Sequence, residues 1–352
     1  MHDRYARQRA LPQIGADGHH RIAAAHAVII GVGALGCVCA DHLARAGIAR
    51  LTLIDRDIVD HTNLHRQPLF TEADADAGLP KVEAASARLR AVNSALAIEP
   101  RVADLTGPRA EALVLSESTP TIIIDGTDNF DTRYILNDIA VKHGIPLIYA
   151  GVVGTRCTVA ALIPTRTPCL RCIAPVPPPA GSIESCDTAG VLGPAVGAVA
   201  SLQAALALRA IAAPHDPHPG VMLEIDAWTL AVRSIDLAPL RDPRCPCCGR
   251  REFPFLAPGA SPPATVLCGR STVQITPPAP ATLDLPALAA RIAPTLHSRV
   301  STLALRIPLP AERADAAHDT VVLTVFPDGR ALVSGITSPE RARSIYARYI
   351  GL

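Results

Sequence analysis

The stretch Ala27-Val-Ile-Ile-Gly31-Val-Gly33-Ala34-Leu-Gly36 decides the fold of this chain. It begins with an apolar run that stops at a glycine, which is typical of a buried strand. The three glycines then precede a helix predicted for Ala34–Ala46, which Gly47 would end. Glycines let the backbone approach a phosphate, and the helix N-terminus supplies free N–H groups. The spacing predicts a nucleotide-binding turn; a tight strand-to-helix turn without a ligand is the alternative.

Strands and helices alternate beyond this turn. Strands are predicted at Leu51–Asp55, Thr121–Asp125 and Pro146–Ala150, and helices at Pro80–Ala95 and Asp131–His143. This alternation indicates an α/β fold with a Rossmann-like, mostly parallel sheet that is covered on both faces.

The pattern changes after Gly151, where Thr158–Ile163 and Val221–Leu237 are expected to continue the sheet as longer, antiparallel strands. The uncharged stretch Gly190–Leu208 between them is long enough to cross a bilayer. It contains proline, glycine and glutamine and has no aromatic anchors, so we expect a buried helix that starts near Pro194.

The chain divides into a main domain at residues 1–252, a proline-rich linker at 253–265 and a small α+β domain at 266–352. In the small domain we expect the strands and helices Thr272–Thr276, Leu285–Ile292, Leu303–Ile307, Val321–Phe326, Ala331–Ser334 and Pro339–Ile350. Its role stays unassigned.

Composition excludes several classes of protein. Of 352 residues, 49% are hydrophobic and 18% are charged, so the chain can bury a core and global disorder is excluded. The net charge is +1, with no basic run, which argues against nucleic acid as the main partner. The N-terminus lacks the profile of a signal peptide, so we expect a cytoplasmic protein. Ten cysteines in a reducing compartment then indicate metal or thiol chemistry.

Polar residues follow the second and third predicted strands. Asp55 ends a strand nineteen residues after Gly36, where a carboxylate would accept hydrogen bonds from a ribose. Arg66 and Lys81 could bring two cations to a polyphosphate. Nucleotidyl transfer needs such cations as pyrophosphate departs, whereas hydride transfer does not. Asp128 follows a buried strand, where it could hold Mg²⁺ or cap the next helix.

Two cysteine pairs, Cys169-Leu-Arg-Cys172 and Cys245-Pro-Cys247-Cys248, lie roughly seventy residues apart. Paired Cys-x-x-Cys motifs are typical of a tetrahedral zinc site, and four thiolates leave no open coordination position. We therefore expect a structural zinc; reduced thiols or a redox site are the alternatives.

These motifs, together with Arg4-Tyr-Ala-Arg7-Gln8, Asn63-Leu-His-Arg66-Gln67, Pro80-Lys81 and Thr127-Asp128-Asn129, resemble the MoeB/ThiF/HesA family over residues 4–250. Its members use ATP to activate ubiquitin-like sulfur carrier proteins. The resemblance implies a homodimer in which Arg7 enters the partner's active site. It also implies these roles: Asp55 on the ribose; Asn63, Arg66, Gln67 and Lys81 along the phosphates; Asp128 on Mg²⁺; and Cys169, Cys172, Cys245 and Cys248 on zinc. Gly31, Gly33, Ala34, Gly36, Asp57 and Asn129 complete the nucleotide-binding candidates, with Ala34 standing where some relatives have a further glycine.

Cys186 lies at the end of a proline-rich segment, Ala174–Gly190, which we interpret as a mobile surface loop. The resemblance places it where some members use a cysteine in sulfur transfer, and a spare exposed thiol is the alternative. Cys37 and Cys39 are expected in the core, and Cys247 is expected to be spare.

The hypothesis is adenylation of the C-terminal glycine carboxylate of a carrier with a Gly-Gly tail, of the ThiS type or the type of the molybdopterin synthase small subunit. The expected sulfur source is a persulfide donor, a cysteine desulfurase or a rhodanese. The alternatives are an adenylating enzyme with another substrate, such as a tRNA-modifying dehydratase, an NAD-dependent oxidoreductase, and a non-catalytic adaptor.

Overall fold

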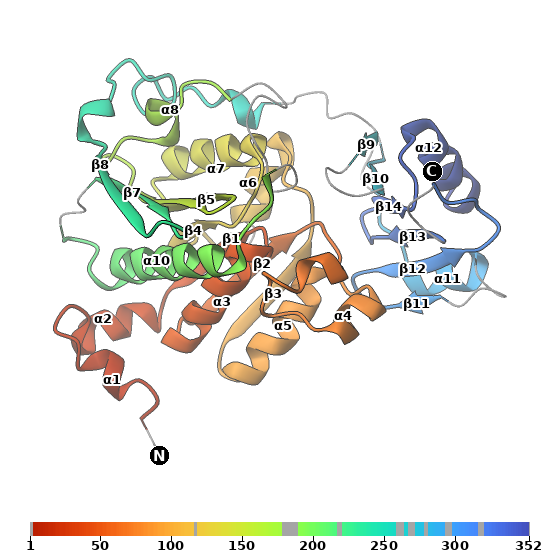
Figure 1. Cartoon of the computed structure of the whole chain (residues 1–352), viewed down its shortest axis with the longest axis horizontal. Helices are drawn as coiled ribbons and strands as arrows, with labels where there is room; N and C mark the ends of the chain where they lie inside the picture. The colour runs from red at the N-terminus through yellow and green to blue at the C-terminus, as the bar shows by residue number, and fades with distance from the viewer. Residues whose placement is uncertain are drawn as a thin grey trace. The chain divides into compact units, whose positions relative to one another are not determined.

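The computed structural model describes residues 3–115, 118–177, 189–216, 220–257, 264–266, 272–277, 281–292, 298–315 and 320–351. The chain forms two compact units (Figure 1). The first consists of Met1–Asp76 and Lys81–Gly259, and the second of Ala77–Pro80 and Ala260–Leu352.

An eight-stranded sheet in the order β3-β2-β1-β4-β5-β6-β7-β8 organises the first unit. The pairs from β3 to β5 are parallel and those from β5 to β8 are antiparallel, which confirms the predicted change of pattern. The strands are β1 (His26–Ile30), β2 (Arg50–Asp55), β3 (Ala97–Val102), β4 (Ile122–Asp125), β5 (Leu147–Val153), β6 (Arg156–Leu162), β7 (Val221–Asp226) and β8 (Ala231–Asp236).

Helices cover both faces of this sheet, with α3 and α10 on one face and α6 and α7 on the other (Figure 1). The helices are α1 (Ala6–Arg9), α2 (Gly15–Ile22), α3 (Ala34–Ala46), α4 (Glu72–Ala77), α5 (Lys81–Val92), α6 (Gly107–Leu115), α7 (Phe130–His143), α8 (Leu170–Ile173) and α10 (Gly193–Ala212), with short 3₁₀ turns η1 (His61–Asn63), η2 (Ala238–Leu240) and η3 (Pro254–Leu256). Gly47 ends α3 with a φ of +87°, as expected for a glycine at a helix C-terminus.

The uncharged helix α10 is a core helix of the first unit. Among the described helices it is the one with the length and apolar composition to cross a membrane, yet 56% of its most apolar window is buried in the protein. It packs on α3, α2, β5 and β6, which confirms the expectation of a buried helix.

Two features of the sheet differ from the prediction. The sequence did not reveal β3, because its Glu99, Pro100 and Arg101 interrupt the apolar run of this half-buried edge strand. The single long strand expected at Val221–Leu237 is instead a hairpin, since the chain turns between β7 and β8. Leu230 has a φ of +59° in that turn.

The second unit is an antiparallel sheet in the order β11-β12-β13-β14-β10-β9. Two helices pack with it around an apolar core that includes Val273, Leu305, Leu323 and Ile345. Its elements are β9 (Ala264–Val266), β10 (Thr272–Ile275), α11 (Leu285–Ile292), β11 (Arg299–Val300), β12 (Leu305–Leu309), β13 (Val321–Val325), β14 (Ala331–Ser334) and α12 (Pro339–Tyr349).

Candidate nucleotide site and cysteine cluster

The glycines of the turn after β1 have two different tasks. A Cβ on Gly36 would lie 2.0 Å from the carbonyl oxygen of Gly31, and a Cβ on Gly126 would lie 2.2 Å from the same oxygen. These two glycines therefore let the β1 turn, α3 and the β4 turn touch through their backbones. Around Gly33 the nearest atom to a built Cβ is Nε2 of Gln67, at 3.8 Å, so the space beside Gly33 is open to a ligand.

Asp55 is fixed at the end of β2 by two backbone donors. Its Oδ2 accepts from the N–H of Val32 at 2.7 Å, and its Oδ1 accepts from the N–H of Asp57 at 2.8 Å. Burial raises the pKa of this carboxyl, and the ammonium of Lys81 opposes that rise. Each carboxylate oxygen has further lone-pair capacity, so the group is oriented and still able to accept a hydroxyl.

Lys81 brings a desolvated positive charge to the same edge of the sheet. Its Nζ lies 2.9 Å from Oδ2 of Asp57, and its side chain is only 5% exposed. Gln67, whose amide nitrogen faces Gly33, is also buried, and its Oε1 has no hydrogen-bond partner among the described residues. A buried acceptor without a partner is costly, and a ligand with a donor would satisfy it.

Asn63 and Arg66 belong to the same polar segment after β2. Asn63 is fully buried in η1, and its carbonyl oxygen accepts from the N–H of Gln67 at 3.0 Å. The half-buried Arg66 donates from Nη1 to the carbonyl oxygen of Thr62 at 2.7 Å. The structure thus gathers the predicted glycines, Asp55, Asp57, Gln67 and Lys81 through the contacts described above, with Asn63 and Arg66 on the adjoining turn. Their assignment to a nucleotide stays a prediction.

The turn after β4 is held by two buried residues that the sequence analysis missed. Arg133 donates from Nη2 to the carbonyl oxygens of Thr127 at 2.9 Å and Ala150 at 3.1 Å. Its Nε lies 3.4 Å from Oδ2 of Asp125, close enough for an ion pair but not aligned as a hydrogen bond. Gln203 of α10 donates from Nε2 to the carbonyl oxygen of Asp125 at 2.7 Å. The available signals in the sequence were the charged Arg133 and the amide Gln203, each within a helix whose residues are mostly apolar or buried.

Asp128 is exposed at the end of this turn, as a carboxylate that could receive a hydrated cation. The residue that caps α7 is Asn129, whose Oδ1 accepts from the N–H of Thr132 at 2.9 Å. The alternative that Asp128 itself caps the helix is therefore wrong. The cap uses the acceptor of Asn129, which leaves its amide N–H groups for a ligand.

Arg7 is not brought to this site within its own chain. It is exposed on α1, which is attached to the C-terminal end of α3, whereas the glycine turn lies at the N-terminal end. The thirteen residues of α3 span about 20 Å. This distance exceeds the reach of an arginine side chain together with the two-residue step from Tyr5 to Arg7, which spans at most about 7 Å.

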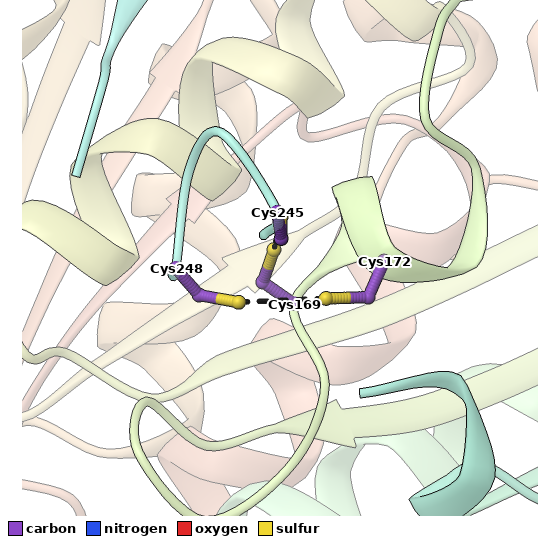
Figure 2. A group of neighbouring side chains, drawn as sticks. All are labelled: Cys169, Cys172, Cys245 and Cys248. Atoms are coloured by element: carbon purple, nitrogen blue, oxygen red, sulfur yellow. Dashed lines mark hydrogen bonds between the residues drawn. The ribbon is translucent and has the colours of Figure 1, made fainter. Parts of the chain in front are cut away.

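Four cysteines converge on one point of the first unit (Figure 2). The Sγ atoms of Cys169 and Cys245 are 3.7 Å apart, those of Cys172 and Cys248 are 3.4 Å apart, and all four lie within 4.8 Å of one another. A Zn–S bond of about 2.3 Å places the sulfur atoms of a tetrahedral site about 3.8 Å apart. The cluster therefore fits zinc, as the spacing predicted, and would tie α8 to the turn after η2.

The other described cysteines are buried. Burial raises the pKa of Cys37 and Cys39 to about 12 and that of Cys157 to about 11. Cys247 is fully buried, and its Sγ accepts from Nδ2 of Asn137 at 3.2 Å. Cys186 and most of its predicted loop lie outside the described residues.

Comparison with known proteins agrees with this geometry. The ThiF family model matches residues 5–247. A Bacillus subtilis (strain 168) protein named sulfur carrier protein ThiS adenylyltransferase is 38% identical over 351 residues, which is 100% of both chains. A Thermus thermophilus protein named sulfur carrier protein adenylyltransferase is 38% identical over 252 residues, covering 70% of this chain and 90% of its own.

Solved structures show the same fold. The structure of E. coli MccB with MccA-N7isoASN aligns with a TM-score of 0.60 at 24% identity, over 70% of this chain and 74% of its own. From the matched family model and the full-length relative, the chain belongs to the ThiF family.

Proposed function

We propose that this protein is an ATP-dependent adenylyltransferase that activates the C-terminal glycine carboxylate of a ubiquitin-like sulfur carrier protein. The observation that carries the proposal is the match, over the whole of both chains, to a relative named for this activity. The arrangement of Asp55, Gln67 and Lys81 around an open glycine turn supports it. A nucleoside triphosphate needs a hydrogen-bond acceptor for its ribose, and hydrogen-bond donors and a cation for its phosphates.

Asp55 would hold the ribose of ATP, and its orientation by two backbone N–H groups means that no reorganisation is needed on binding. The backbone at Gly33 would approach the phosphates. Asn63, Arg66 and Gln67 would line the phosphates together with Lys81, whose Nζ lies 2.9 Å from Oδ2 of Asp57. Asp128 would hold Mg²⁺, which supplies positive charge as pyrophosphate departs.

The reaction needs alignment more than proton transfer. The carrier's terminal carboxylate is already ionised at neutral pH, so it attacks the α-phosphorus of ATP without a general base. The new bond joins a carboxylate oxygen to that phosphorus, and the bond to the bridging oxygen of pyrophosphate breaks. Lys81, Arg66 and Arg7 of a second copy would stabilise the charge that develops on the departing pyrophosphate.

Three further parts complete the proposal. The protein acts as a homodimer, because Arg7 lies too far from its own glycine turn. Zinc in the four-cysteine cluster is structural, since no coordination position is left open. The outer sulfur of a persulfide donor, a cysteine desulfurase or a rhodanese, then attacks the acyl-adenylate and displaces AMP, which leaves the acyl group and the donor joined through an acyl disulfide. A second thiol attacks the donor's sulfur in that disulfide, so that the thiocarboxylate leaves and a disulfide forms between the thiol and the donor. Cys186 is proposed to take part in this transfer.

Carrier-dependent ATP–pyrophosphate exchange tests the proposal. Purified protein should exchange labelled pyrophosphate into ATP only when a carrier with a Gly-Gly tail is present. Lys81→Met and Asp128→Ala should each lower the exchange rate by about 10²–10³ with the fold intact. Exchange without a carrier, stimulation by tRNA instead, or oxidation of NADH would each contradict the proposal and support one of the alternatives.

We further propose that the carrier is of the ThiS type, since the full-length relative carries that name. A panel of carriers separates the types. Exchange at low micromolar carrier should be at least tenfold faster with a ThiS-type protein than with a molybdopterin-synthase-type small subunit. Equal rates, or the reverse preference, would refute this assignment without affecting the adenylation chemistry.

A further inference from the structure

The segment that carries Arg7 is fastened to the C-terminal end of α3 by a set of specific contacts. The ring of Tyr5 packs on Gly47, where a built Cβ would lie 2.6 Å from the ring. The hydroxyl of Tyr5 accepts from Nδ2 of the buried Asn93 at 3.3 Å, and the same amide donates to the carbonyl oxygen of Ala44 at 3.0 Å. A glycine is required at this position both by its positive φ and by the ring above it.

A second residue of the segment repeats the attachment one turn later. Gln8 donates from Nε2 to the carbonyl oxygen of Ala46 at 2.9 Å. Carbonyl groups at the end of a helix lack i→i+4 partners within the helix, so the Gln8 amide supplies a donor to the carbonyl of Ala46. The Asn93 amide is a second donor to the carbonyl of Ala44, which also accepts from the N–H of Gly47 at 3.3 Å. His19 of α2 supports both residues, with its ring 4.6 Å from that of Tyr5 and its Nδ1 3.3 Å from Nε2 of Gln8.

This attachment fixes the direction in which Arg7 points. Tyr5 and Gln8 are half-buried and three residues apart, so they face α3 together, whereas Arg7 between them is exposed. Among the described residues, the Arg7 guanidinium has no ion pair or hydrogen bond within the chain. Figure 1 shows α1 and α2 at the periphery of the first unit.

We infer that Tyr5, Gln8 and Asn93 are positioning residues that hold Arg7 in place for the nucleotide site of a second copy of this chain. The inference rests on the proposed function, in which Arg7 acts in trans. Helix α3 begins at the glycine turn and ends at this attachment. A single helix therefore fixes where the Arg7 of a subunit lies relative to the nucleotide site of the same subunit. The attachment should therefore serve the partner's reaction and leave the subunit's own pocket unchanged.

Heterodimers that combine two inactive variants test this inference directly. Tyr5→Ala alone should lower carrier-dependent exchange at least tenfold, as Arg7→Ala does. A heterodimer of Tyr5→Ala with Asp128→Ala, isolated through two affinity tags, should recover about half of the wild-type activity, because one of its two sites has an intact pocket and a correctly held arginine. Tyr5→Phe keeps the ring on Gly47 and should retain most of the activity. Arg9→Ala, on the same short helix, is the matched control and should match the wild type.

The outcomes separate the possible failures. Wild-type activity in Tyr5→Ala overturns the inference. So does a Tyr5→Ala/Asp128→Ala heterodimer that stays inactive while the Arg7→Ala/Asp128→Ala heterodimer recovers, and in that case the proposed function stands. If the Arg7→Ala/Asp128→Ala heterodimer also stays inactive, the trans arginine fails and the inference fails with it. Should Tyr5→Ala not fold, Gln8→Ala takes its place in the same heterodimer, with the same expected recovery.

Discussion

Two glycines of the same turn should respond in opposite ways to the same substitution. In Gly36→Ala the new methyl carbon would start 2.0 Å from the carbonyl oxygen of Gly31. Carbon–oxygen contacts of about 3.3 Å or more are normal, so the start of α3 and the end of β1 must separate by about 1.3 Å. Forcing such a shift in a packed interior costs about 1–3 kcal/mol or more, and the better helix propensity of alanine returns about 1 kcal/mol at most.

We therefore expect Gly36→Ala to destabilise the first unit by about 2 kcal/mol, which lowers its Tm by at least about 4 °C. Gly33→Ala meets no atom closer than 3.8 Å, and its stability should stay within about 1 kcal/mol of the wild type. Its methyl group would instead occupy the space beside Gln67 that a phosphate needs. The affinity for ATP should fall at least tenfold, or about 1.4 kcal/mol.

Two measurements on each variant make this comparison: the Tm from thermal unfolding without ligand, and the affinity for ATP from titration calorimetry. If Gly33→Ala binds ATP as tightly as the wild type, the phosphate site does not lie at this turn. If Gly36→Ala unfolds at the wild-type temperature, the backbone contact between α3 and β1 is not a constraint, and the division of tasks between the glycines is wrong.

Three more predictions follow from buried groups. Cys245→Ser should lose bound zinc, measured by metal analysis, and should melt earlier, whereas Cys247→Ser should keep the full zinc content; equal loss in both would refute the ligand set. Arg133→Met leaves the buried carboxyl of Asp125 without its cation and should cost about 3–5 kcal/mol in urea unfolding, and an unchanged midpoint would contradict this clamp. Burial, with the Arg50 charge second, lowers the pKa of His26 from 6.5 to about 4, so the folded state resists its protonation. Stability should then fall as the pH drops from about 6.5 to about 4, because the unfolded state binds the proton first; His26→Gln should flatten this slope, and a parallel slope would refute it.

Local sequence signals were enough for much of the fold. Gly31, Gly33 and Gly36 lie within six residues, so strand, turn and helix could be predicted from one short stretch, and α3 has the predicted bounds. The spacing of the cysteines within each pair is visible in the sequence. The approach of the two pairs to each other depends on α7, because its Asn137 hydrogen-bonds to both segments, at Leu170 and at Cys247.

The missing parts depend on contacts between distant residues. Gly126 is needed only because β4 pairs with β1, which brings its backbone against Gly31. Arg133 and Gln203 are polar residues in helices, and sequence alone does not show that they face the sheet rather than water. Arg7 was predicted as catalytic from resemblance, but its distance from the glycine turn emerges only when α3 is built as a helix between them.

The burial of Cys37, Cys39 and Cys157 has a consequence for selectivity. A thiol whose pKa is about 11 or 12 is almost wholly protonated at neutral pH, and protonated thiols are poor nucleophiles. The proposed function brings a persulfide donor to this enzyme, and thiolates of the enzyme's own would react with such sulfur to form unproductive disulfides and persulfides. Because these three side chains are covered and protonated, the proposed reaction would lose no sulfur to the core of the enzyme.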